Sequence, residues 1–248
     1  PPIPAPGRIL CIGMNYSEHI REMGREPPEY PAMFVRFPDS LVGHGQPILR
    51  PRVSTHYDFE GELAVVIGRR ARHVGRDEAL DYVGGYTCLL DGSVRDFQRH
   101  TSQFTAGKNF TGSGAMGPCL VTVDEIPDPR ELVLETYVND ERMQYGEISD
   151  LCIDIPEMIR YLSQMFPLNP GDVISTGTPS GVGAARTPPV WLEPGDRVRV
   201  NVSVIGDLEN TVAAEAAWRR AGAGSGTRGC VPAPARRFPG ESPAARRS

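Results

Sequence analysis

Apolar residues in this chain alternate with polar ones or gather in short runs, a pattern typical of strands. Residues 8–14 form one brief apolar run. Residues 56–68 begin with alternation and end in the continuous run AVVIG. Another apolar run, at 84–90, stops at Asp91. We expect strands at all three places, the last two entering a core.

Helical signals are confined to short segments. In NYSEHIREMG, Asn15 has Glu18 three residues later, which is a capping-box pattern, and Gly24 stands where a C-cap falls. Residues 76–82 predict a second short helix. Residues 156–166 begin with proline at a first helical position and carry apolar residues at helical spacing, which predicts a third.

The second half of the chain predicts paired strands. Residues 133–138 and 143–147 flank Asn139-Asp140, a dipeptide typical of hairpin turns. Residues 192–212 indicate a turn followed by two alternating strands. These elements together predict a β-rich α+β domain from about residue 7 to 215, without an internal repeat.

Charge divides the chain unevenly. The 248 residues include 25 Arg, one Lys and 31 acids, for a net charge of −5. Residues 218–248 carry seven Arg and one Glu, a net of +6, so residues 1–217 carry −11. Of those last 31 residues, 18 are Gly, Ala, Pro or Ser, a composition that cannot bury enough surface to fold. We predict a folded domain over 1–217 and a disordered, inert tail over 218–248.

Several classes of protein are disfavoured. An acidic domain is a poor partner for nucleic acid. No apolar stretch approaches the roughly 20 residues of a membrane span, and the first residues lack the apolar core of a signal peptide. The five cysteines are scattered and never form a CxxC pair, which supports neither a disulfide framework nor a zinc site. We therefore expect a cytoplasmic protein that binds neither membrane nor nucleic acid.

Three acids mark the strand predicted at 57–62. Because side chains alternate along a strand, Asp58, Glu60 and Glu62 project to one face. Like charges on a strand entering a core call for a cation, and Mg²⁺ or Mn²⁺ is the economical choice, with Asp91 as a further ligand. The alternative is an edge strand whose acids face water or pair with arginines.

A second candidate lies in the first predicted helix. His19 and Glu22 are three residues apart, so they share a face and can hydrogen-bond. The carboxylate would orient the imidazole and raise its basicity, as a general base requires. A surface histidine beside a glutamate is the simpler interpretation.

Two further features carry candidate chemistry. Lys108 is the only lysine, so position 108 either needs a compact ammonium or retains a lysine by chance. The segment TGTPSGVG at 176–183, with Gly177 and Thr178, offers N–H and hydroxyl donors for an anion but matches no nucleotide-binding spacing. A tight structural turn explains it equally well.

Five motifs occur in order along the chain: NYxxHxxE at 15–22, ExE and LAVVIG at 60–68, GGYTCLLDGSVRDFQ at 84–98, GKNF at 107–110 and GDVISTGTPSGVG at 171–183. Together they resemble the catalytic domain of the fumarylacetoacetate hydrolase family over about residues 8–212. The resemblance implies a mixed β-sandwich roll, a homodimer, and Mg²⁺ or Mn²⁺ held by Glu60, Glu62 and Asp91, without Asp58.

The resemblance also implies a site and a chemistry. His19 and Glu22 match the water-activating dyad, and Lys108 and Gln98 match residues lining the substrate site. Arg36 stands where many relatives have lysine, so we expect it to contact the substrate, together with Gly177 and Thr178.

The implied reaction is C–C bond hydrolysis of an acylpyruvate-type 2-oxo acid through a metal-bound enolate. The alternatives are a decarboxylase or an isomerase of a 2-oxo or 2-hydroxydienoic dicarboxylic acid on the same site, or a non-catalytic binding domain.

Overall fold

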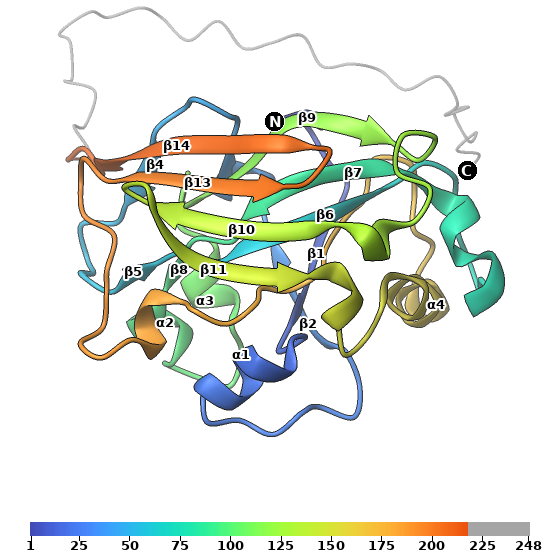
Figure 1. Ribbon diagram of the computed structural model, residues 1–248, viewed down its shortest axis with the longest axis horizontal. Helices are drawn as coiled ribbons and strands as arrows, with labels where there is room; N and C mark the ends of the chain where they lie inside the picture. Colours follow the sequence, from blue (N-terminus) through green and yellow to red (C-terminus); the bar gives the residue numbers. More distant parts are fainter. Residues whose placement is uncertain (218–248) are drawn as a thin grey trace, which may run out of the picture. The chain divides into compact units, whose positions relative to one another are not determined.

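The computed structural model describes residues 1–217, so the tail predicted at 218–248 lies outside the described residues. Two mixed sheets dominate the fold (Figure 1). The larger has seven strands in the order β2-β1-β12-β6-β7-β9-β3. Their bounds are β2 Ala32–Arg36, β1 Ile9–Gly13, β12 Val173–Ser175, β6 Gly61–Ile67, β7 Val83–Leu90, β9 Gly114–Thr122 and β3 Leu41–Val42.

The five-stranded sheet has the order β11-β10-β13-β14-β4 and packs over the larger one, with β10 against β6, β13 against β7 and β14 against β9 (Figure 1). Apolar side chains of both sheets share one core, as expected of an α+β sandwich. A Cβ on Gly61 would lie 2.0 Å from Thr136 Oγ1, so the sheets approach closely there. The strands are β11 Glu141–Glu147, β10 Val133–Val138, β13 Arg197–Val202, β14 Gly206–Ala214 and β4 Ile48–Arg50.

The single strand predicted over 56–68 is wrong in one respect, because it is interrupted. Tyr57–Asp58 forms β5, which pairs with β8 (Ser93–Val94) in a separate two-stranded sheet. At the break, Phe59 N–H bonds to the Asp58 carboxylate, and Gly61 N–H bonds to Gln144. These bonds divert the backbone from the regular ladder, so Asp58 belongs to a different sheet from Glu62.

Helices are short, as the sequence predicts. The α-helices are α1 Ser17–Glu22, α2 Arg95–Gln98, α3 Thr105–Lys108 and α4 Ile155–Met165. The 3₁₀ turns are η1 Pro38–Ser40, η2 Arg76–Tyr82, η3 Pro129–Glu131, η4 Ile148–Asp150 and η5 Gly183–Ala185. None of the helices in residues 1–217 is long and apolar enough to cross a bilayer.

Local signals give mixed results at the element ends. Asn139 and Asp140 both have positive φ, 51° and 69°, which confirms the hairpin turn. Gly24 has φ 63° just after α1 and confirms the C-terminal signal. The N-cap assigned to Asn15 is wrong, because Tyr16 holds that position without a side-chain cap. Asn15 instead bonds to residues far along the chain.

Candidate active site

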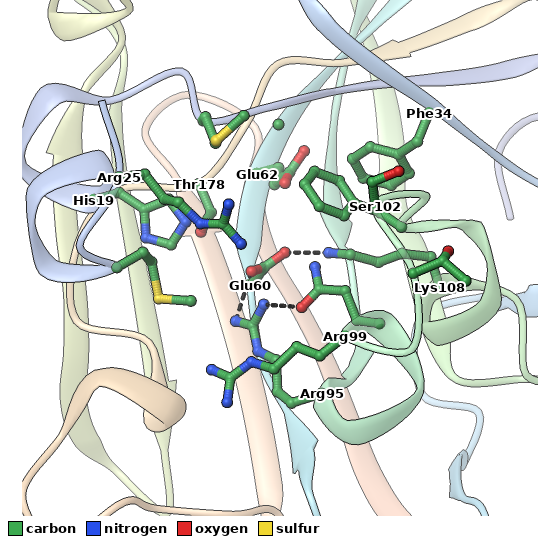
Figure 2. A pocket seen from close by; sticks show the side chains of 16 residues that line it. His19, Arg25, Phe34, Glu60, Glu62, Arg95, Arg99, Ser102, Lys108 and Thr178 are labelled. Atoms are coloured by element: carbon green, nitrogen blue, oxygen red, sulfur yellow. Dashed lines mark hydrogen bonds and ion pairs between the residues drawn. The ribbon is translucent and has the colours of Figure 1, made fainter. Parts of the chain in front are cut away.

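A pocket of about 260 Å³ lies between α1, the α2–α3 segment and the start of β6 (Figure 2). It contains candidates from each motif found in the sequence. Its walls include His19, Glu60, Glu62, Arg95, Gln98, Lys108 and Thr178, with Arg25, Phe34, Arg99 and Phe104 among the other lining residues.

Two acids of a buried triad, Glu60 and Glu62, line this pocket, and the fully buried Asp91 completes the triad. Glu60, Glu62 and Asp91 each place one carboxylate oxygen within 4.8 Å of the others, and all three are buried. Strand pairing brings them together: β6 and β7 are antiparallel, Gly61 lies opposite Leu90, and Asp91 N–H bonds to Glu60 O at 2.8 Å. The end of one strand thus meets the start of its neighbour.

One oxygen of Glu60 and one of Asp91 is held by a buried arginine. Arg95 Nη2 lies 2.6 Å from Glu60 Oε1, and Arg36 Nη1 donates to Asp91 Oδ1. The Lys108 ammonium contacts the second oxygen of both acids, at 2.5 Å for Asp91 Oδ2. The two arginines therefore orient the carboxylates from one side, and the ammonium bridges their remaining oxygens.

Glu62 is held by neutral donors. Its Oε2 accepts hydrogen bonds from the Ser175 hydroxyl and from Gly177 N–H, the latter at 3.0 Å. Its Oε1 accepts no hydrogen bond from residues 1–217. One oxygen of this carboxylate thus remains available as a ligand.

Burial and charge separate the two glutamates. Burial raises the pKa of Glu62, the negative charges of Asp91 and Glu60 add to the effect, and the pKa reaches about 8. Burial also raises the pKa of Glu60, but the charges of Arg95 and Lys108 outweigh it and hold that pKa well below its usual range. For Lys108, burial lowers the pKa, but the negative charges of Asp91 and Glu60 outweigh burial and raise the pKa above its usual value, so the ammonium stays charged.

This donor set fits a hard divalent ion. Three buried carboxylates with oxygens within one coordination sphere are the ligands that Mg²⁺ and Mn²⁺ prefer. The supporting donors from Arg95, Arg36 and Ser175 orient those ligands, as outer groups do in metal centres. The residues present can therefore hold either metal.

Asp58 does not join the triad. Its carboxylate accepts hydrogen bonds from Gly183 N–H at 2.8 Å and Ala184 N–H at 2.9 Å, and it pairs with Arg95 Nε at 2.8 Å. The interpretation of three acids around one cation is therefore wrong for Asp58. This side chain anchors the Gly-rich loop and fixes the arginine that holds Glu60.

The His19–Glu22 pair forms as predicted. His19 Nδ1 lies 2.7 Å from Glu22 Oε1, and Glu22 Oε2 accepts from Gly181 N–H at 2.9 Å. His19 is only 6% exposed and lines the pocket, so the simpler interpretation of a surface histidine is wrong. The Gly-rich loop thus orients the carboxylate that orients the imidazole.

Only two of the four residues expected to contact substrate line the pocket. Gln98 and Thr178 line the pocket, whereas Gly177 contributes its N–H to Glu62. Arg36 does not line the pocket: its side chain is fully buried and, besides Asp91, donates to Gly92 O at 3.0 Å. The structure therefore places Arg36 behind a candidate metal ligand.

The sequence analysis assigned no role to Arg95 and only a helix N-cap to Asn15. Arg95 joins Asp58 to Glu60, and its position in the GSVRDFQ motif was the available signal. Asn15 donates to Ile153 O at 3.0 Å and Thr176 O at 2.8 Å, and it accepts from Ile153 N–H at 2.8 Å. It ties the start of α1 to two distant loops.

Comparison with known proteins gives consistent matches. The family described as fumarylacetoacetate (FAA) hydrolase C-terminal matches residues 8–213. Oxaloacetate tautomerase YisK of Bacillus subtilis is 43% identical over 215 residues, covering 85% of this chain and 71% of that protein. A mitochondrial oxaloacetate tautomerase of Homo sapiens is 38% identical over 213 residues, covering 85% of this chain and 68% of its own length.

Solved structures of this family also match the chain. Fumarylpyruvate hydrolase from Pseudomonas aeruginosa, in complex with Mn²⁺ and pyruvate, has a TM-score of 0.77 at 31% identity, covering 84% of this chain and 90% of that one. The 5-carboxymethyl-2-hydroxymuconate delta-isomerase from Mycobacterium smegmatis has a TM-score of 0.75 at 36% identity, covering 86% and 80%.

Proposed function

Because the chain belongs to the fumarylacetoacetate hydrolase family, whose matched members include tautomerases, hydrolases and isomerases, we propose that it interconverts the keto and enol forms of oxaloacetate with a divalent metal. The observation that carries the proposal is the meeting of a buried acid triad and an oriented histidine in one pocket of about 260 Å³. Two relatives at 43% and 38% identity bear the name oxaloacetate tautomerase, which supports this reaction over its alternatives.

Glu60, Glu62 and Asp91 would hold the Mg²⁺ or Mn²⁺ ion. When bound, the ion supplies Lewis-acid polarisation of oxygens on the 2-oxo acid. Arg95 and Lys108 hold one of these ligands, Glu60, ionised and oriented.

Tautomerisation needs a base for the proton on C3 and stabilisation of the charge that then develops on the 2-oxo oxygen. Glu22 engages Nδ1 of His19, so Nε2 is left to take the C3 proton. The enol forms when the 2-oxo oxygen takes up a proton in turn, from the imidazolium or from water, and both transfers run backward in the reverse direction. The Lys108 ammonium contributes positive charge to the pocket in which that oxygen becomes negative. No atom is gained or lost in the reaction.

The experiment follows the ultraviolet absorbance of the enol of oxaloacetate with and without Mn²⁺. His19→Ala should slow tautomerisation by about 10²–10⁴-fold, the range for a positioned general base, while Mn²⁺ affinity stays unchanged. His44→Ala is the control, because His44 is exposed and lies outside this pocket. A His19→Ala rate within twofold of the parent would contradict the assignment.

Acylpyruvate hydrolysis is the second candidate. A His–Glu pair can deprotonate water, and the similar fumarylpyruvate hydrolase supports this reaction. Mass spectrometry separates the outcomes, since hydrolysis of acetylpyruvate releases pyruvate and acetate, decarboxylation of oxaloacetate releases CO₂, and tautomerisation changes no mass. Lack of all three activities with Mn²⁺ present would favour a binding domain.

We further propose that the chain acts as a homodimer in the cytoplasm. The support is the family resemblance for the dimer and the scattered cysteines for the compartment. Analytical ultracentrifugation of the full chain tests the dimer.

A further inference from the structure

Two arginines of the pocket differ from its other cations. Arg95 and Lys108 are buried and contact carboxylates of the triad or its surroundings. Arg25 and Arg99 are exposed, line the pocket and form no ion pair with any acid of residues 1–217. In Figure 2 both side chains lie around the same opening that leads to Glu60. Their charge is therefore free to bind a ligand.

Both arginines have anchored backbones. Arg25 N–H bonds to Ile20 O at 3.0 Å, a bond that the positive φ of Gly24 allows, so the residue is tied to the end of α1. Arg99 N–H bonds to Arg95 O at 3.2 Å in the last turn of α2. The backbone of each arginine is therefore fixed relative to the site. Arg25 follows the helix that carries His19, and Arg99 follows Gln98.

The charge balance of the site calls for additional cations when the substrate is a dianion. The four buried acids outnumber the three buried cations by one. When a divalent ion binds, the net charge of this group becomes +1. That charge offsets one carboxylate only. Arg25 and Arg99 supply two more charges at the outer side of the pocket. The four acids are Asp58, Glu60, Glu62 and Asp91, and the three cations are Arg36, Arg95 and Lys108.

We propose that Arg25 and Arg99 bind the carboxylate at the distal end of the substrate and thereby select dicarboxylic 2-oxo acids over monocarboxylic ones. The inference rests on the proposed function for the position of the proximal end at the acid triad. Guanidinium groups suit the task, because each presents a planar pair of donors that matches a carboxylate. Arg95 and Lys108 of the same pocket already contact acids, so Arg25 and Arg99 are the two arginines left to receive the distal end of the substrate.

The test measures binding by calorimetry on the Mn²⁺-loaded full chain. The probes are 2-oxoglutarate and 2-oxopentanoate, which have the same chain length and differ in the distal carboxylate. Arg25→Gln and Arg99→Gln should each weaken 2-oxoglutarate binding by about 10- to 100-fold, as expected for loss of a charge-assisted hydrogen bond, and leave 2-oxopentanoate within twofold. Arg→Lys at either position should restore part of the affinity.

Arg21→Gln is the matched control. Arg21 also lies on α1, but it pairs with Glu18 and does not line the pocket. Unchanged 2-oxoglutarate affinity in the double variant Arg25→Gln/Arg99→Gln, or an equal loss for both probes, would overturn the inference.

A parallel assay of oxaloacetate tautomerisation distinguishes this inference from the proposed function. If the parent does not tautomerise oxaloacetate but the variants lose their preference for 2-oxoglutarate, the carboxylate site is supported and the proposed reaction is rejected. If the parent tautomerises oxaloacetate and the double variant still prefers 2-oxoglutarate, only the carboxylate site is rejected.

Discussion

Lys108 Nζ lies 2.5 Å from Asp91 Oδ2, and the same ammonium contacts Glu60. The lysine ends α3, and Asn109 beside it fixes that helix to β2 through a hydrogen bond to Val35 O at 2.9 Å. A buried cation thus stands among carboxylates proposed as metal ligands. The geometry of its head group matters more than its charge alone.

Lys108→Arg should therefore impair catalysis. A guanidinium keeps the charge but is larger than the ammonium, and Arg36 and Arg95 already occupy the other sides of Asp91 and Glu60. We expect turnover to fall by about 10²-fold, the effect of a displacement of about 1 Å, with a smaller effect on Mn²⁺ affinity. Steady-state kinetics within twofold of the parent would show that any cation suffices at position 108.

Glu62→Gln should abolish divalent-ion binding and activity together. The substitution preserves shape and removes the only carboxylate of the triad that has an oxygen without a donor from residues 1–217. Calorimetry with Mn²⁺ measures the loss, and Glu141→Gln, an exposed acid on β11, serves as the control. Parent-like Mn²⁺ affinity in Glu62→Gln would place the metal elsewhere.

Metal binding should also release a proton at neutral pH. The pKa of Glu62 is about 8 in the metal-free site, so below that pH the carboxyl is protonated and must ionise before it coordinates a metal. Mn²⁺ affinity should then rise with pH up to about 8 and level off above it. Calorimetry in buffers of different ionisation enthalpy, at about pH 6.5 and about pH 9, measures the release. Equal release at both values would contradict the raised pKa.

Asn15→Ala should destabilise the fold through long-range bonds. Asn15 is fully buried, and its amide makes three hydrogen bonds to the backbone of Ile153 and Thr176. Removing it leaves buried backbone groups unpaired, so we expect unfolding free energy to drop by about 2–4 kcal/mol. Denaturant unfolding measures the change against Asn201→Ala, whose partner Asp207 is exposed. A loss as small as that of the control would show that water replaces these bonds.

Short-range information in the sequence determined the elements and much of the site. The Asn139-Asp140 turn, the Gly24 signal and the α4 helix depend on residues within a few positions of one another, so the sequence predicted them. Strand alternation predicted acids on one face, Asp58 included, and the family resemblance implied the triad of Glu60, Glu62 and Asp91. The i,i+3 spacing predicted the contact between His19 and Glu22.

Only the tertiary structure decided what holds each acid, and it shows why Asp58, which strand alternation includes, stands apart from the site. Asp58 is taken by Gly183 and Ala184, which lie more than 120 positions further along the chain. Arg36 is buried against Asp91, 55 positions away, so it supports a ligand rather than facing the pocket. A strand pattern predicts on which face a side chain lies. The charged groups and hydrogen-bond donors that contact that side chain come from distant segments, which only folding brings together.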